Sequence, residues 1–416
     1  MRVAIVGAGV AGLACAHRLS AEHDVMVFEA GDYAGGHAHT VRVDLADETH
    51  WVDTGFIVLN DRNYPSFERL LGELGVATQP SEMSFSVSDE HGGLEYNGSS
   101  PNGLFADRAN LVRPAFLRMV RDLLRFNREA PALIGLNGSG PSLGAFLDDG
   151  GYSSEFVDHL IVPQASAVWS ADPGQMWSFP AGMLAEFFSN HGMFELIGRP
   201  KWRTVVGGSH RYVEKITSPL GDRVRLHTPV TRVERFADRV EVTPADGDPE
   251  EFDEVVLATH SDQALAMLAD PTEAEAEVLG AVAYQPNEAV LHTDRSLLPR
   301  RRRAWASWNF HLLDEPVAQT TVTYRMNSLQ ALSSAEQICV TLNRSDRIDP
   351  AKVIGTYRYE HPVFTHDALA AQARWDEVSG RNRTHFCGAW WGYGFHEDGV
   401  KSAEKVCESF DRSLVA

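Results

Sequence analysis

The sequence predicts an α/β fold in which a parallel sheet is joined to an inserted α+β domain that contains an antiparallel sheet and helices. Two observations lead to this prediction. The chain begins with apolar runs at 2–6 and 25–28 on either side of a helical segment at 13–22. A hairpin pattern and a long helical region then interrupt this alternation, and apolar runs of the buried type return later.

A glycine-rich turn separates the first apolar run from the helical segment. Gly7 permits a tight turn, Gly9 lets the backbone approach a diphosphate, and Gly12 lets the helix pack closely on the strand. Glu29 ends the second apolar run, at the spacing of an acid that accepts hydrogen bonds from a ribose. The pattern predicts a Rossmann-like nucleotide site, and a glycine turn without a ligand is the alternative. The predicted lining residues are Gly7, Gly9, Val10, Ala11, Gly12, Glu29 and Ala30.

Composition limits the classes to which the protein can belong. The chain has 416 residues, too many for one ordinary core, so two domains are expected. A formal net charge of −20 argues against nucleic acid as a partner, because its phosphates would be repelled. No apolar run has membrane-spanning length, and the first strand takes up the N-terminus, so no signal peptide is expected. Four scattered cysteines without a CxxC pair fit a reducing compartment, and we expect a cytoplasmic protein.

The patterns along the chain predict that each domain is assembled from separated pieces. Apolar and serine residues alternate at 84–88, which predicts a hairpin in a second sheet, and 111–195 has a helical pattern. The chain ends with a strand from 384, a glycine turn and a helix that we expect to begin near Gly399. Short strands are predicted between these regions at 224–226, 230–233, 240–242 and 254–259. We assign 1–80, 205–285 and 376–416 to the nucleotide-binding domain, and 81–204 and 286–375 to a substrate domain.

Glycine motifs occur at both ends of the chain. The first comprises the turn at 6–13 with Glu29, followed by Gly35-Gly36-His37. The second is Gly394-Phe395-His396-Glu397, with Ser402 shortly after it. Together they resemble the flavin-containing amine oxidase superfamily of FAD-dependent oxidoreductases, and the resemblance covers nearly the whole chain. It implies an FAD-binding domain of the amine-oxidase type.

The resemblance implies FAD as the cofactor, and non-covalent binding, because no cysteine occupies the tail position used for tethering. NAD is the weaker candidate, since the N-terminal fingerprint alone does not distinguish the two dinucleotides. Val230 is placed near the adenine, with a plain core strand as the equal alternative. The further cofactor residues that the resemblance implies are Gly35, Gly36, His37, Thr54, Gly55, Phe56, Val230, Gly388, Phe395, His396 and Val400.

His37 replaces an arginine that in amine oxidases lies over the diphosphate. Histidine is shorter and often neutral, so its electrostatic contribution there is weaker. His37 and His39 also form an H-x-H pair. Because no cysteine or carboxylate cluster completes a ligand set, we predict no metal site.

Residues near the last turn are the candidates for chemistry. For proton removal from a substrate, His396 is the first candidate base and Glu397 the second; alternatively, only the backbone of His396 contacts the flavin. Ring-bearing residues are predicted to line the substrate pocket, although they could equally pack the joint between the domains. These residues are Phe56, Trp169, Trp391 and Tyr393.

Two segments, 52–58 and 392–399, resemble a bacterial subgroup of predicted NAD/FAD-binding proteins. Members often accompany cyclopropane-fatty-acid-synthase-like methyltransferases, and some relatives desaturate methylated fatty acyl chains. The resemblance therefore implies hydride removal from an aliphatic substrate, such as a methylated fatty-acyl or phospholipid chain. Two alternatives stay open: an amine oxidase that forms an imine, and a non-catalytic flavoprotein partner of a lipid methyltransferase.

Residues 111–128 are predicted to form an amphipathic helix that is basic in an otherwise acidic chain. Such a helix can rest on an anionic membrane surface, which would make the protein membrane-peripheral. The alternative is a surface helix whose arginines pair with nearby acids. We expect Phe116, Val120, Leu123 and Leu124 on the apolar face and Arg118, Arg121, Arg125 and Arg128 on the basic face. The sequence leaves the oligomeric state open.

Overall fold

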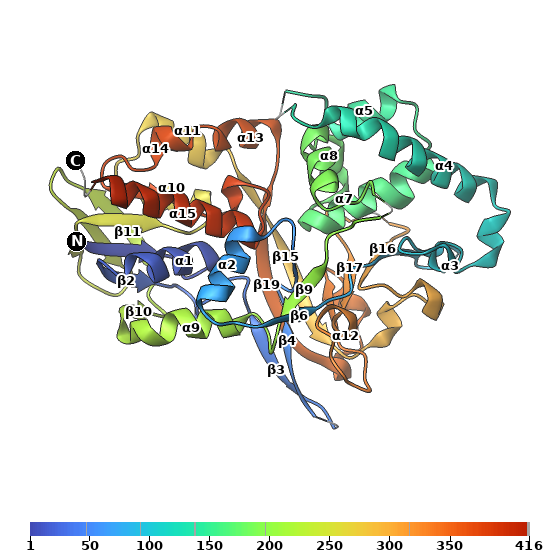
Figure 1. Cartoon of the computed structure of the whole chain (residues 1–416), viewed down its shortest axis with the longest axis horizontal. Helices are drawn as coiled ribbons and strands as arrows, with labels where there is room; N and C mark the ends of the chain where they lie inside the picture. Colours follow the sequence, from blue (N-terminus) through green and yellow to red (C-terminus); the bar gives the residue numbers. More distant parts are fainter. Residues whose placement is uncertain (47, 92, 137–138, 196, 316, 414–416) are drawn as a thin grey trace.

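The computed structural model describes residues 1–416 except 47, 92, 137–138, 196, 316 and 414–416. Two lobes lie side by side, and both ends of the chain lie in the same lobe (Figure 1). Two long paired strands, β15 (Ala283–His292) and β19 (Val353–Val363), run between the lobes. Among the described residues, no helix is both long and apolar enough to cross a membrane.

The lobe that holds both termini is built on a five-stranded parallel sheet. Its central strand β1 pairs on one side with β2 and on the other with β14. Residues 3–5 of β1 have no exposed surface, as expected for a strand covered on both faces. The strand order is β10 (Val224–Arg225), β2 (Asp24–Phe28), β1 (Arg2–Val6), β14 (Glu254–Leu257) and β20 (Thr384–Phe386).

Helices from both ends of the chain pack against this sheet. Helix α1 (Val10–Leu19) contacts the last helix, α15 (His396–Ser413), and Gly399 makes the crossing possible because a Cβ there would lie 2.7 Å from Val10 Cγ1. The other helices of this lobe are α2 (Pro65–Glu73), α9 (His210–Leu220), α10 (Ser261–Met267), α11 (Glu273–Gly280), α13 (His366–Gln372) and α14 (Trp375–Val378). An antiparallel sheet of β11 (Val230–Arg235), β12 (Val240–Pro244) and β13 (Glu250–Phe252) completes the lobe.

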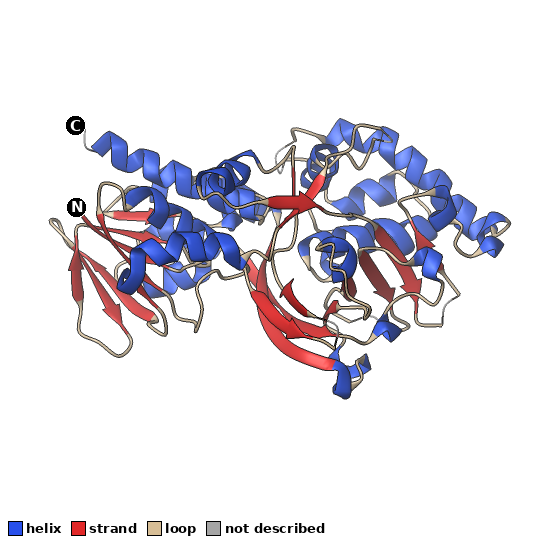
Figure 2. Cartoon of the chain, turned by 60° about the horizontal axis from the view of Figure 1, so that its bottom comes forward, coloured by secondary structure: helices blue, strands red, loops and turns tan. Residues whose placement is uncertain are grey.

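The second lobe contains a seven-stranded mixed sheet, visible as the curved red sheet in Figure 2. The hairpin predicted at 84–88 is confirmed: β7 and β8 pair antiparallel at the edge of this sheet. Apart from β7 against β16, its neighbouring strands are antiparallel. The strand order is β19, β15, β18 (Cys339–Leu342), β17 (Val322–Arg325), β16 (Trp308–Leu312), β7 (Phe85–Asp89) and β8 (Glu95–Asn97).

Helices cover the second lobe around a core rich in aromatic side chains. Phe126 lies at the centre of this core and contacts rings from several helices, including Phe156 at 5.5 Å and Phe188 at 6.4 Å between ring centroids. The helices are α3 (Pro101–Leu104), α4 (Pro114–Glu129), α5 (Leu143–Asp149), α6 (Ser154–Phe156), α7 (Val162–Trp169), α8 (Ala181–Asn190) and α12 (Met326–Leu329). Small sheets near the joint contain β3 (Thr40–Asp44), β4 (Thr49–Asp53), β5 (Leu59–Asn60), β6 (Thr78–Pro80) and β9 (Trp202–Val205).

The expected element types are found, but two helices begin earlier than the sequence predicts. Helix α1 starts at Val10 rather than at 13, because Leu13 N already donates to Gly9 O. Helix α15 starts at His396 rather than near Gly399, since Gly399 N donates to Phe395 O and Asp398 accepts from Phe395 N. In both cases the glycine belongs to a close helix contact and does not mark a helix end.

We predict that Gly12→Ala destabilises the protein by about 2 kcal/mol or more, since overpacking of this kind typically costs ~1–3 kcal/mol. The added methyl group would lie 1.9 Å from Gly7 O, a backbone atom that cannot move without opening the turn. Gly72→Ala is the matched control, because no described atom lies within 4 Å of the new Cβ. Urea unfolding measures both changes, and equal stabilities for the two variants would contradict the packing account.

Candidate functional site

The turn between β1 and α1 presents backbone rather than side chains. Gly7 has φ +102°, and a Cβ there would lie 2.9 Å from Ala258 O at the end of β14. In contrast, no described atom lies within 4 Å of the position that a Gly9 Cβ would take. Among the described residues, no side chain caps the start of α1, so its first N–H groups are available to a ligand. Val10, Ala11 and Gly12 form this first turn, as predicted for an anion site.

Glu29 lies beside the glycine turn. Its carboxylate accepts hydrogen bonds from Ala8 N and Gly31 N, both at 2.8 Å, and it is followed by the exposed Ala30. The segment before β11 reaches the same place, because Thr228 N donates to Glu29 O. Val230, two residues further on, is half-buried at the start of β11. The structure therefore brings the predicted ribose acid and the predicted adenine strand together.

The Gly35-Gly36-His37 loop packs directly on the glycine turn. Gly35 N donates to Ala8 O, and a Cβ on Gly36 would lie 3.3 Å from Gly9 Cα. The loop also meets Gly55, where a Cβ would lie 2.4 Å from His37 O, and Phe56 N donates to the same oxygen. Three segments that are distant in sequence thus approach one another at backbone distance.

His37 contributes a buried nitrogen to this region. Its Nε2 has no hydrogen-bond partner among the described residues. Burial lowers the pKa of His37 well below its usual value, and the nearby His361 and His260 lower this pKa further. The ring lies 5.1 Å from His361 and 5.0 Å from Tyr359, measured between centroids. His37 therefore presents a neutral imidazole whose Nε2 is unoccupied.

The C-terminal turn continues the site. Gly388 N donates to Ser402 Oγ at 2.9 Å, which ties the end of β20 to α15. A Cβ on Gly388 would lie 2.4 Å from Trp390 Nε1. Val400 is fully buried, and the indole N–H of the half-exposed Trp391 has no hydrogen-bond partner among the described residues. The resemblance placed Gly388 and Val400 at the cofactor; Val400 packs in the same core as Val10 and Ala11 of the N-terminal turn, and Gly388 is bonded to Ser402 of the same helix.

His396 and Glu397 have structural partners at the start of α15. The His396 ring stacks on Phe56 with centroids 3.6 Å apart, and its Nε2 lies 3.1 Å from Tyr212 Oη. Burial lowers the pKa of His396 to about 3, which makes it a poor proton acceptor. The Glu397 carboxylate accepts from Ser66 N at 3.2 Å and Phe67 N at 2.9 Å, at the start of α2. This geometry disfavours both side chains as bases, and a catalytic role for either one stays a prediction.

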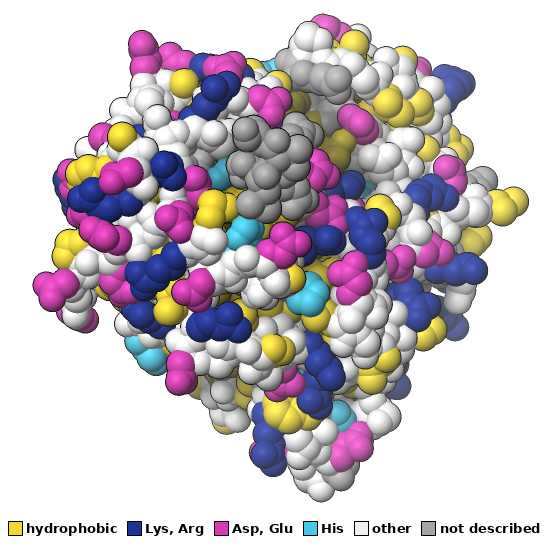
Figure 3. Space-filling view, turned by 60° about the vertical axis from the view of Figure 1, so that its left-hand side comes forward, with side chains coloured by type: hydrophobic (Ala, Val, Ile, Leu, Met, Phe, Trp, Pro, Cys, Tyr) yellow, Lys and Arg dark blue, Asp and Glu magenta, His cyan; other side chains and the backbone are white. Residues whose placement is uncertain are grey.

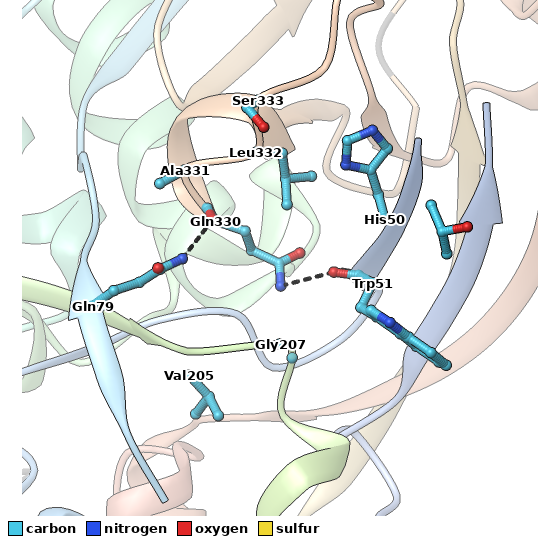
Figure 4. A pocket seen from close by; sticks show the side chains of 11 residues that line it. His50, Trp51, Gln79, Val205, Gly207, Gln330, Ala331, Leu332 and Ser333 are labelled. Atoms are coloured by element: carbon cyan, nitrogen blue, oxygen red, sulfur yellow. Dashed lines mark hydrogen bonds between the residues drawn. The ribbon is translucent and has the colours of Figure 1, made fainter. Parts of the chain in front are cut away.

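Asp53 is a fully buried carboxylate at the end of β4. It accepts hydrogen bonds from Thr40 Oγ1, from Ser209 N and Oγ, and from Gln330 Nε2, at 2.5–2.9 Å. Asp53 N in turn donates to Gln330 Oε1 at 2.8 Å. Figure 4 shows Gln330 also reaching Trp51 O, beside a small pocket that is shared with Gln79. These bonds hold the segment that leads to Thr54, Gly55 and Phe56.

The four predicted pocket residues are divided between two clusters. Trp169 Nε1 donates to Tyr393 O at 3.1 Å, and Phe187 packs against both of their rings. Phe395 joins this cluster by stacking on Phe187 at 5.4 Å. Phe56 packs on His396, and Trp391 packs on Trp390 at 4.0 Å on the nucleotide-binding side. The structure thus brings Trp169 and Tyr393 together, while Phe56 and Trp391 pack against the core of the first lobe.

Several polar residues near the site are not found by the sequence analysis. Asn287 on β15 is fully buried and donates to His361 Nδ1 on β19 at 3.1 Å. An amide nitrogen can only donate, so His361 Nδ1 is the acceptor and the ring proton of the neutral form is on Nε2. Thr54 Oγ1 meets Tyr359 Oη at 2.6 Å and His39 Nδ1 at 2.8 Å. Thr54 and His39 were named from the sequence, whereas Asn287, Tyr359 and His361 were not, because no pattern within one segment indicates that β15 and β19 pass beside the His37 loop.

Comparison with known families identifies the chain. Residues 10–335 match the model of the family described as flavin containing amine oxidoreductase. The chain belongs to this family. It is 26% identical over 268 residues to amine oxidase [flavin-containing] A from Canis lupus familiaris, a match that covers 57% of this chain and 45% of the relative. The chain spans less than half the length of the curated relatives it matches.

Solved structures confirm the predicted fold class. A putrescine oxidase variant aligns with a TM-score of 0.70 at 17% identity, covering 99% of both chains. A fatty acid isomerase from P. acnes that produces CLA aligns with a TM-score of 0.67 at 18% identity, covering 98% of both chains. At these identities the likeness shows a shared fold. The superfamily resemblance inferred from the two glycine motifs is confirmed by the family match.

The site fits the flavin cofactor of this family. Within the described part of the chain, space is open beside Gly9, no side chain caps the first N–H groups of α1, and the buried ring nitrogens of His37 and Trp391 have no hydrogen-bond partner. A bound dinucleotide can fill this space and satisfy these groups. FAD, the cofactor of this family, is therefore the group that this site fits. Among the described residues, no three His, Cys, Asp or Glu side chains are placed to hold a metal ion. The sulfur atoms of Cys15 and Cys387 lie 3.8 Å apart as buried free thiols.

We predict that Asp53→Asn reduces the pH dependence of the free energy of unfolding between pH 4 and 6. Burial raises the pKa of Asp53 from 3.8 to about 6, so the folded protein holds this proton more tightly than the unfolded chain does. Stability therefore falls as pH rises through this window, with a slope of up to about 1.4 kcal/mol per pH unit from this group. Asparagine does not titrate and should flatten the slope.

The same substitution should also lower stability at pH 5. Both carboxylate oxygens of Asp53 accept hydrogen bonds, so in either amide orientation the asparagine NH₂ would lie against a donor of Thr40, Ser209 or Gln330, at a cost of about 1–3 kcal/mol. The matched control is Asp376→Asn, whose side chain is 85% exposed. Denaturant unfolding at several pH values measures both variants. If the free energy of unfolding of Asp53→Asn varied with pH as steeply as that of the parent protein, burial of Asp53 would not be the source of this pH dependence.

Proposed function

We propose that the protein is an FAD-dependent oxidoreductase that removes hydride from an aliphatic substrate, and specifically from a fatty-acyl or phospholipid chain that can carry a methyl branch. Family membership supports the redox chemistry. The observation that supports an apolar substrate is the ring cluster of Trp169, Phe187, Tyr393 and Phe395. The indole N–H of Trp169 is bonded to Tyr393 O and the Tyr393 hydroxyl interacts with Glu186, so the rings of the cluster contribute mainly carbon surface.

Bound FAD would supply a two-electron acceptor for the hydride, and the proton from the neighbouring carbon would pass to a base or a polar relay as the double bond forms. Within the chain, the glycine turn and the start of α1 bind the diphosphate, and Glu29 holds the ribose. The aromatic cluster orients the chain of the substrate and excludes water. A P. acnes fatty acid isomerase shares the fold, which is compatible with fatty-acid chemistry on this scaffold.

An amine oxidase that forms an imine and hydrogen peroxide is the second candidate, and one residue favours it. Glu186 on α8 lies beside Tyr393 and helps to raise the pKa of that phenol, together with the larger effect of burial. A carboxylate beside an aromatic cluster can attract an ammonium group. The third candidate, a non-catalytic flavoprotein partner of a lipid methyltransferase, predicts that no substrate reduces the flavin.

Anaerobic reduction of the FAD-loaded protein distinguishes these candidates. We expect a phospholipid with methyl-branched acyl chains to bleach the flavin absorbance and putrescine to leave it unchanged, because the aromatic cluster offers carbon surface. In the Glu186→Gln variant, bleaching by the phospholipid should persist. Bleaching by putrescine that Glu186→Gln abolishes would establish the amine oxidase instead, and a flavin that neither compound reduces would favour the non-catalytic role.

We also propose that His396 is a positioning residue that holds Phe56 through ring stacking, rather than the base that the sequence suggested. His396→Ala should retain FAD but lower kcat by at least tenfold on the bleaching substrate, because Phe56 loses its stacking partner. His396→Phe keeps a ring and no basic nitrogen, and should recover most of the lost kcat. If His396 were the base, the His396→Phe variant would be as inactive as the His396→Ala variant. Full activity of His396→Ala would show that the side chain has no role in turnover.

A further inference from the structure

Helix α4 lies along the outer edge of the second lobe, far from both chain ends (Figure 1). Its inner side is fixed by Phe116, Met119 and Phe126, which are at most 4% exposed. Asp122 is also buried on this side and accepts a hydrogen bond from Ser153 N at 3.0 Å. The orientation of the helix about its own axis is therefore set by packing, which determines the residues that face solvent.

The outer side of α4 and the short turn before it has an unusual composition. Every exposed residue between Arg108 and Arg128, a segment that the structure describes completely, is either an arginine or an apolar residue. Leu111 is 52% exposed, Val112 79%, Leu117 43% and Leu124 65%. The side chains of Arg121 and Arg128 are 71% and 76% exposed. We call Leu111, Val112, Leu117, Arg121, Leu124 and Arg128 the basic–apolar face.

The spacing of these residues places them on one side of the helix. Leu117, Arg121, Leu124 and Arg128 follow one another at steps of four, three and four residues, which is the helical repeat. The sequence analysis placed Leu124 on one apolar face with Phe116, and this is wrong, because Phe116 is 4% exposed and Leu124 is 65% exposed. Because Asp122 and Phe126 occupy the inner side, Leu124 points to solvent between two arginines.

The four predicted arginines also separate into two pairs. Arg118 forms an ion pair with Glu155, and Arg125 stacks on Tyr152 at 3.7 Å and donates to Gly150 O. These two arginines are bound to neighbouring elements of the lobe. Among the described residues, the ion-pair partners of Arg121 and Arg128 are their sequence neighbours Asp122 and Glu129, each at 3.4 Å, and these two arginines are the most exposed of the four. Pairs at that distance and exposure contribute little energy, so both cations can exchange partners.

We propose that the basic–apolar face docks on the surface of an anionic lipid bilayer. Exposed leucine and valine side chains gain free energy by entering the interfacial region, and interspersed arginines pair with lipid phosphates. The chain as a whole carries a net charge of −20 and is repelled by such a surface. The basic–apolar face combines exposed arginines with apolar side chains, and the acids that pair with its arginines are the buried Asp122 and the half-buried Glu129, so this face sets the orientation of approach.

Other occupants of this face fit less well. A second copy of the chain would bring two arginine-bearing faces together, and their positive charges would repel. Nucleic acid would bind the arginines but would leave the exposed leucines without a role. The face shown in Figure 3 carries acids and bases interspersed, which is the ordinary pattern of a solvated surface. The proposal rests on the composition of α4 and does not depend on the substrate proposed for the flavin site.

Vesicle sedimentation with the FAD-loaded protein tests the proposal. Vesicles of phosphatidylcholine with phosphatidylglycerol are compared with phosphatidylcholine alone, at low and at physiological salt. We expect binding to the anionic vesicles that weakens with salt. Arg121→Glu with Arg128→Glu should reduce the partition coefficient at least tenfold, and Leu117→Gln with Leu124→Gln should reduce it several-fold.

Matched controls carry the same chemical changes on other surfaces. Arg42→Glu with Arg232→Glu reverses two exposed arginines, and Val353→Gln with Ile354→Gln replaces two exposed apolar residues. Both control variants should bind like the parent, and flavin absorbance verifies that every variant is folded. Absence of parent binding to anionic vesicles would overturn the proposal, as would equal binding by the α4 variants. Self-association that the α4 variants abolish, with no vesicle binding, would identify a second copy as the occupant instead.

Discussion

The close approach of backbone segments around the start of α1 is the constraint on which the rest of this structure depends. The turn at Gly7–Gly12 contacts the end of β14, the loop at 35–37 and helix α15, and at each contact a Cβ would lie closer than about 3.4 Å to another atom. Only glycine permits such distances without strain. Because these segments come from both ends of the chain, the nucleotide site exists only after the whole lobe has assembled.

A buried carboxylate provides the second constraint. Asp53 connects β4 with the start of α9 through Ser209, and with the second lobe through Gln330. A charge without water is costly unless several donors surround it, and here four hydrogen bonds do so. The network therefore holds the Thr54–Phe56 segment at one position between the lobes. That segment in turn carries the ring that stacks on His396.

Aromatic packing connects the site to the outer surface. Phe395, in the last turn before α15, stacks on Phe187 of α8, and the neighbouring Phe188 packs on Phe126 of α4. The residues that bury one side of α4 thus belong to the same core against which Tyr393 and Phe395 pack. The opposite side of α4 therefore faces solvent, and its exposed arginines and leucines are the basis for the proposed contact with a lipid surface.

The sequence by itself determined the parallel sheet, the glycine turn, the acid at Glu29 and the flavin family, because these features are encoded by local spacing within short segments. Through the resemblance of both glycine motifs to one superfamily, it also predicted that Gly388 and the last helix meet, and Gly388 N does donate to Ser402 Oγ of α15. Tertiary structure alone decided that His396 stacks under Phe56, that Glu397 caps α2, and that Asn287 and His361 lie beside the His37 loop. It also decided which way Leu124 points. These outcomes depend on which surfaces meet when distant segments pack, and the spacing of residues within one segment carries no information about that.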